Sequence, residues 1–103
     1  MIPRKLTIFD KETLTHHLLA MQGEDRRLRF GGLVSDDYII EYVNNSFTQN
    51  DKWFGVDEGG KIVAACHASI IGDTAELGCS VDLEYRGHKL AQSMFDRAVT
   101  WLS

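Results

Sequence analysis

The stretch VDLEYRGHKLAQSMFDRAVTWLS, residues 81–103, decides the fold, because it predicts the end of a strand, a short turn and a helix. Apolar residues in its second half recur at three- and four-residue steps, which places them on one face of a helix. They are Ala91, Met94, Phe95, Ala98 and Leu102. The basic turn 86–89 therefore lies at the start of this helix.

This turn is suited to binding an anion. Backbone N–H groups at a helix start lack partners within the helix, and the helix dipole favours a negative group there. Gly87 allows the backbone to approach a ligand closely, and Arg86, His88 and Lys89 can add positive charge. We predict an anion site that a phosphate fits best. The alternative is an ordinary strand-turn-helix unit with a few surface cations.

Residues 81–91 resemble the acetyl-coenzyme A signature of the GNAT N-acetyltransferases. That signature is Arg or Gln, two variable residues, Gly, one variable residue, then Gly or Ala. Arg86 and Ala91 match it, whereas Lys89 stands where the family usually has Gly and Leu83 where Pro is common. The context fits, because the motif follows a predicted strand and opens an amphipathic helix.

The resemblance implies binding of acetyl-CoA along the last strand and the turn after it. The pantetheine arm would pair with backbone groups of Cys79 and Val81. The pyrophosphate would be held by the signature residues, which are Arg86, Gly87, His88, Lys89, Leu90 and Ala91. The implied reaction is direct acetyl transfer to an amine, on a protein lysine or a small molecule, with no metal.

Such a reaction requires an acceptor ammonium to lose its proton, for which a nearby carboxylate is useful. Glu76 is the candidate base, at a position where several family members carry the catalytic glutamate. The alternative is a solvated carboxylate on a half-buried strand. The segment Asp25–Phe30 also resembles the Arg-x-Leu-Arg-Phe segment of GNAT domains of the protein-lysine acetyltransferase type. Its arginines either line the acceptor site or belong to a solvated loop.

Composition restricts the partners. The formal net charge of −4 argues against nucleic acid or an anionic membrane as the main partner. No apolar run has the length of a membrane span, and the first residues lack a signal-peptide pattern. Cys66 and Cys79 are expected to be reduced core thiols in a cytoplasmic protein. The histidines, among them His67, could suggest a metal site with these cysteines, but no pair has the spacing of a zinc motif, so we expect no metal.

The elements upstream of residue 81 complete a predicted order of β-α-α-β-β-β-α. The buried side of the second helix is predicted to hold Ile39, Ile40, Val43 and Phe47. Gly59-Gly60 and Gly72-Asp73 indicate hairpin turns. The predicted ranges are a strand 5–9, a helix capped by Asp10 and ending near Gly23, a charged connection 24–32, a helix capped by Ser35, and strands 53–57, 61–71 and 74–81.

These features predict an α+β fold, with a mostly antiparallel sheet flanked by helices, in one GNAT-like domain over residues 1–103. The order of elements resembles the first two-thirds of the GNAT fold, so we expect a C-terminally incomplete domain. Its last strand, 74–81, would then be an unpaired edge that recruits a second copy, which predicts a homodimer or larger homo-oligomer. The alternatives to an enzyme are a catalytically weak or inactive GNAT-like module that binds CoA or a protein partner, and a small interaction domain without a cofactor.

Overall fold

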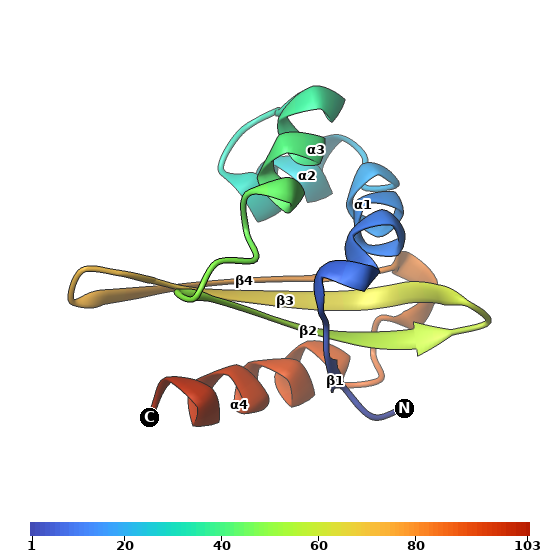
Figure 1. Cartoon of the computed structure of the whole chain (residues 1–103). Coiled ribbons are helices and arrows are strands. Elements are labelled where there is room, and N and C mark those ends of the chain that lie inside the picture. Colours follow the sequence, from blue (N-terminus) through green and yellow to red (C-terminus); the bar gives the residue numbers. More distant parts are fainter.

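The computed structural model describes all 103 residues as one antiparallel sheet with helices on both faces. Helices α1, α2 and α3 cover one face and α4 covers the other (Figure 1). The predicted α+β class is confirmed. The sheet has the order β1-β2-β3-β4, with β1 (Arg4–Lys5), β2 (Asp51–Glu58), β3 (Lys61–Ile71) and β4 (Thr74–Val81). The helices are η1 (Ile8–Asp10), α1 (Lys11–Leu19), α2 (Gly23–Phe30), α3 (Asp36–Asn44), η2 (Leu83–Tyr85) and α4 (Leu90–Leu102).

Glycine turns fix the register of the central strands. Gly59 and Gly60 have φ values of 59° and 78°, and a two-residue hairpin turn of type I′ needs positive φ at both positions. Gly72, with φ 62°, opens the second turn. Antiparallel β3 and β4 then pair from Ile71 opposite Thr74 to Ala64 opposite Val81. Both predicted hairpins are confirmed.

The sheet separates two apolar cores. Both faces of β3 are covered, so its residues 62–68 are all buried. All of them except His67 are apolar, as expected for a strand covered on both faces. On one face α4 contributes Leu90, Met94 and Ala98, which pack on residues of β2 and β3. On the other face α1 and α3 contribute Leu14, Leu18, Ile39 and Val43. No helix has the length and apolar character needed to cross a membrane.

The prediction of a connection over residues 24–32 is wrong, because residues 23–30 form α2. None of its residues is buried, so its sequence lacks the apolar stripe from which a helix is usually predicted. Contacts of Arg26 hold it instead. The guanidinium donates to the carbonyl oxygens of Leu19 and Met21 at 2.9 and 3.1 Å, and to that of Val34 at 3.1 Å. Gly23 consequently opens α2, whereas α1 already ends at Leu19.

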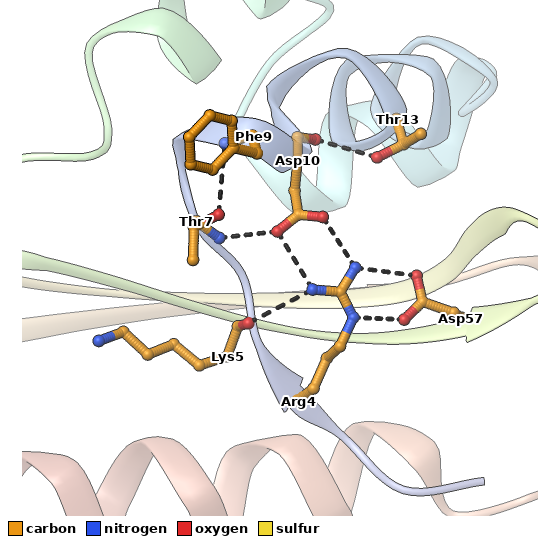
Figure 2. A network of polar contacts seen from close by, with 7 residues as sticks. All are labelled: Arg4, Lys5, Thr7, Phe9, Asp10, Thr13 and Asp57. Carbon is orange, nitrogen blue, oxygen red and sulfur yellow. Dashed lines mark hydrogen bonds and ion pairs between the residues drawn. The ribbon is translucent and has the colours of Figure 1, made fainter.

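The first strand is also shorter than predicted, because Thr7 starts a helical turn. The Asp10 carboxylate accepts from the Thr7 backbone N–H at 2.8 Å, and the Thr7 hydroxyl accepts from the Phe9 N–H at 3.3 Å. Figure 2 shows Arg4 between Asp10 and Asp57, where its guanidinium bonds to both carboxylates. These bonds lower the pKa of Asp10 and tie η1 to β2.

Two predicted apolar faces are rotated in the structure. Ser35 caps α3 as predicted, with its hydroxyl accepting from the Tyr38 N–H at 3.1 Å. Ile40, however, is 41% exposed, because Ile39 and Val43 centre the buried face. In α4 the buried residues are Leu90, Met94 and Ala98, so Ala91 and Phe95 of the predicted stripe are exposed.

Candidate functional site

Two hollows lie along β4 and meet at Arg29. The first has a volume of about 380 Å³ and receives residues from α2, α3 and three strands. The second has a volume of about 400 Å³ and lies where β4 approaches the start of α4. The first is lined by Arg29, Tyr42, Asn45, Ser46, Asp51, His67, Ser69, Ile71, Glu76, Leu77 and Gly78. The second is lined by Met21, Asp25, Leu28, Arg29, Cys79, Ser80, Val81, Arg86 and Ala91.

Arg29 extends from α2 onto β4 beside Gly78. Its guanidinium lies 4.8 Å from the Phe30 ring centroid and 5.5 Å from that of Tyr42. No carboxylate forms an ion pair with it, and its buried Nε has no hydrogen-bond acceptor. Arg29 is therefore a cation that aromatic rings hold between the two hollows. Some of its N–H groups have no hydrogen-bond acceptor within the chain.

A chain of hydrogen bonds crosses the first hollow from α2 to β2. Arg29 Nη2 donates to the Tyr42 hydroxyl at 3.0 Å, and that hydroxyl lies 2.6 Å from His67 Nδ1. His67 Nε2 lies 2.7 Å from Asp51 Oδ1. Because the carboxylate can only accept, Nε2 carries the proton and Nδ1 accepts from Tyr42. The Trp53 ring stacks on the imidazole at a centroid distance of 4.6 Å.

Burial affects the pKa values of all three residues, His67, Tyr42 and Asp51, in this chain of hydrogen bonds. It lowers the pKa of His67 against the opposing effect of Asp51, and it raises the pKa of Tyr42 against the opposing effect of Arg29. Burial also acts to raise the pKa of Asp51, but hydrogen bonds from Thr48 and His67 outweigh it and lower that pKa. At neutral pH the imidazole and the phenol are thus neutral beside a carboxylate.

The spacing of residues along the sequence does not reveal these hydrogen bonds. His67 was considered only as a metal ligand, and no function was predicted for Tyr42 or Asp51. The available signal was a histidine in the middle of an otherwise apolar stretch of β3, which indicates a buried polar group that needs partners. Glu76, the predicted base, is exposed on β4 and lines the same hollow.

The second hollow is bordered by the two ends of the signature turn, Arg86 and Ala91. No backbone N–H from residue 87 to residue 92 donates a hydrogen bond within the chain. Gly87 has φ 90°, and Lys89, with φ 60°, is the sole residue other than glycine with positive φ. These unpaired donors at the start of α4 fit a polyphosphate. Leu90 is buried in the core, so that residue can offer a ligand its backbone and little else.

Other predicted ligand groups are already engaged. Arg86 Nε donates to the Val81 carbonyl at 3.1 Å, and Arg86 Nη2 lies 3.0 Å from Asp25 Oδ2. Both side chains of this ion pair are about half exposed, which leaves room for exchange. Cys79 lies directly opposite Cys66, with both thiols free and 2.7 Å between their sulfur atoms. The contact with Cys79, together with burial, raises the pKa of Cys66.

A second buried histidine, His17, contacts Ser80, which lines this hollow. His17 of α1 has its Nε2 2.8 Å from the Ser80 hydroxyl, and its Nδ1 lies 3.0 Å from Asp82 Oδ1. Burial lowers the pKa of His17, although Asp82 opposes this. The residue therefore joins α1 to the end of β4 in its neutral form. No three His, Cys, Asp or Glu side chains in the chain converge as a metal site.

The fold is thus an antiparallel sheet whose last strand leads into a helix start with unpaired N–H groups, an arrangement that suits an anion. The model of the acetyltransferase (GNAT) family matches residues 16–103. The chain therefore belongs to this family, as its signature turn predicts.

Solved structures share the fold. The GNAT domain of S. lividans PAT has a TM-score of 0.75 at 19% identity and covers 95% of this chain. A predicted acetyltransferase from Clostridium acetobutylicum with acetyl-CoA has a TM-score of 0.72 at 19% identity over 96% of this chain. PaiA N-acetyltransferase from Thermoplasma acidophilum, in complex with coenzyme A, has a TM-score of 0.63 at 20% identity over 96%. This chain spans 62%, 71% and 69% of those three chains, respectively. No curated protein matches it.

Proposed function

We propose that this chain transfers an acetyl group from acetyl-coenzyme A to an amine. The observation that carries the proposal is the junction of the two hollows at Arg29. One hollow is bordered by Arg86 and Ala91, beside the unpaired N–H groups of residues 87–92. The other holds carboxylate, phenol and imidazole groups suited to moving a proton. Two structures of similar fold, one with coenzyme A and one with acetyl-CoA, support the choice of acetyl-coenzyme A as the acetyl donor.

In this proposal the second hollow holds the coenzyme. The N–H groups of residues 87–92 bind the pyrophosphate, with the Lys89 and His88 side chains beside it. Cys79 and Val81 offer backbone groups to the pantetheine arm. Acetyl-coenzyme A supplies an acetyl group activated as a thioester. Arg86 reaches the phosphates by exchanging its bond to Asp25, because both side chains are half exposed.

The first hollow receives the amine, from a protein lysine or a small molecule. Glu76 and Asp51 give this hollow two carboxylates, which attract an ammonium group. Glu76 is exposed at its rim and takes the proton from the incoming amine. Loss of this carboxylate in Glu76→Gln should lower the acetylation rate by about 10²–10⁴-fold if no other base replaces it.

A thiol-release assay tests the proposal directly. The chain, acetyl-CoA and a panel of amines that includes lysine peptides and polyamines should release free thiol only when both substrates are present. Calorimetry of coenzyme A binding, with Glu76→Gln binding as the parent does, separates binding from turnover. Release no faster than spontaneous aminolysis across the panel would contradict the proposal.

We also propose that β4 pairs with a second copy of the chain. This strand is the last in the sheet order, so its outer edge has no strand partner, and an unpaired edge tends to recruit another strand. The pairing would involve the part of residues 74–81 that the pantetheine arm leaves free at Cys79 and Val81, and it would give a homodimer. Light scattering coupled to size exclusion should report twice the chain mass of 11.6 kDa. A monomer at high concentration would exclude the dimer.

A further inference from the structure

We propose that Tyr42, His67 and Asp51 form a proton relay in which Tyr42 takes the second proton of the acceptor, the one that the amine loses as it attacks after Glu76 has deprotonated its ammonium form. This inference rests on the proposed acetyl transfer. It adds Tyr42 as a residue that touches the acceptor, and it adds His67 and Asp51 as residues that position Tyr42 and accept its proton. The three come from α3, β3 and β2, and their side chains all line the first hollow.

The hydrogen bonds of the chain run in one direction. Arg29 Nη2 donates to the Tyr42 oxygen at 3.0 Å, and the Tyr42 hydroxyl donates to His67 Nδ1 across 2.6 Å. His67 Nε2 donates to Asp51 Oδ1 across 2.7 Å. A phenol oxygen has two lone pairs, of which Arg29 uses one. The second remains for a ligand in the hollow, so Tyr42 is the point at which a proton can enter the chain.

The proton transfers balance. Tyr42 accepts a proton from the amine nitrogen while its own proton moves to His67 Nδ1, and His67 becomes an imidazolium between Tyr42 and Asp51. The nitrogen lone pair forms the bond to the acetyl carbon, and the carbon–sulfur bond breaks with its electron pair on sulfur. Tyr42 then delivers a proton to that sulfur and recovers one from His67. The products are an amide and a thiol, and the three side chains return to their starting state.

Charges from every neighbouring element act on His67. Asp51 on β2 and Glu76 on β4 favour the imidazolium, whereas Arg29 on α2 opposes it. Burial outweighs the two carboxylates and lowers the pKa of His67, so the imidazole is neutral and ready to accept at neutral pH. Tyr42 on α3 is kept as the neutral phenol, because burial raises its pKa. A phenol and a neutral imidazole are the starting forms that the relay needs.

Tyr42→Phe tests the relay, with Tyr38→Phe as the matched control. Tyr38 lies one helical turn away, stacks on Tyr42 with ring centroids 6.4 Å apart and is 50% exposed. Thiol release by Tyr42→Phe should fall by about 10²-fold or more, the lower range for a lost acid–base group. Coenzyme A affinity should stay at the parent value. Tyr38→Phe should retain the parent rate.

The pH profile separates the relay from a structural role. In the parent, kcat/KM should fall on the acid side as His67 takes a proton, and Asp51→Asn should move this limb to lower pH because the imidazolium loses its carboxylate. Tyr42→Phe and His67→Gln should each remove the limb. The double variant should be no slower than either single one, because the residues act as a unit.

Nitrogen-15 NMR of His67 gives a readout that needs no turnover. The relay requires a proton on Nε2 and none on Nδ1 at neutral pH, and the reverse tautomer would overturn it. Thiol release that Tyr42→Phe leaves unchanged, in rate and in pH profile, would overturn the relay alone. Absence of thiol release from the parent with every amine would overturn the proposed function, whatever the tautomer.

Discussion

Gly78 leaves the space that the Arg29 guanidinium occupies. A Cβ atom at position 78 would lie 2.6 Å from Arg29 Nη1 and 2.7 Å from its Cζ. The φ angle of Gly78 is not in the left-handed region, so the backbone does not require glycine there. The missing side chain instead allows α2 to place a cation against β4, between the two hollows.

Gly78→Ala should therefore displace Arg29 while the fold persists. The atom that must move is the end of a flexible side chain, so we expect a loss of stability of about 0.5–1 kcal/mol, the scale of one cation–π contact. Urea unfolding measures this loss. Gly32→Ala is the control, because a Cβ there meets nothing within 4 Å. Equal stabilities for parent and Gly78→Ala would show that Arg29 gains nothing from its place on the aromatic rings.

Lys89→Gly should stabilise the fold. Lys89 precedes α4 with φ 60°, a conformation that costs a residue with a Cβ about 1 kcal/mol. Glycine adopts it without that cost. Lys89→Ala also removes the charge but keeps the Cβ, so it should not share the gain in the free energy of unfolding. A gain of the same size in both variants would assign the effect to charge.

Asp25→Asn should tighten the binding of coenzyme A. Asp25 lies 3.0 Å from Arg86 Nη2 and competes with a phosphate for that guanidinium. An exposed ion pair is worth up to about 1 kcal/mol, which corresponds to about fivefold in affinity. Calorimetry at low salt should show the gain, and added salt should reduce it. In an Arg86→Ala background the gain should vanish, and a persisting gain would mean that Arg86 does not bind the ligand.

Stability should fall as the pH is lowered through the range in which unfolded histidine takes a proton. Burial lowers the pKa of folded His17 below the unfolded value of about 6.5. Below that pH the unfolded chain therefore binds more protons than the folded chain, and the free energy of unfolding decreases with a slope that approaches about 1.4 kcal/mol per pH unit for each such group.

Urea unfolding between pH 8 and pH 5 measures this slope. His17→Gln should reduce it, whereas His16→Gln, on the exposed side of the same helix, should leave it as in the parent. A His17→Gln variant with the parent slope would show that other groups cause the acid destabilisation. His67 contributes in the same direction, because burial also lowers its pKa.

The sequence predicted the parts of the fold that depend on local backbone chemistry. The Gly59-Gly60 turn and the Ser35 cap each follow from conformations or hydrogen bonds available to few residue types, and both are in place. The signature turn was predicted on the same basis. Helix α2 was missed because Arg26 secures it through carbonyls that lie in other elements, and such contacts leave no periodic pattern.

The candidate site was predicted only in part, for a related reason. Cys79, Val81, Arg86 and Ala91 lie in one short segment, and all four line the second hollow. The chain of Tyr42, His67 and Asp51 joins three elements. Its assembly depends on tertiary packing, which residue spacing does not report. The roles proposed for Glu76 and for residues 86–91 stay predictions until a ligand is bound.

Arg29 lines both hollows, and a shared lining residue would make the two proposed ligands sensitive to each other. If the guanidinium turns toward an anion in one hollow, it changes the charge and shape of the other. Any resulting change in affinity must be reciprocal, so an amine that tightens coenzyme A binding is itself bound more tightly by the same factor.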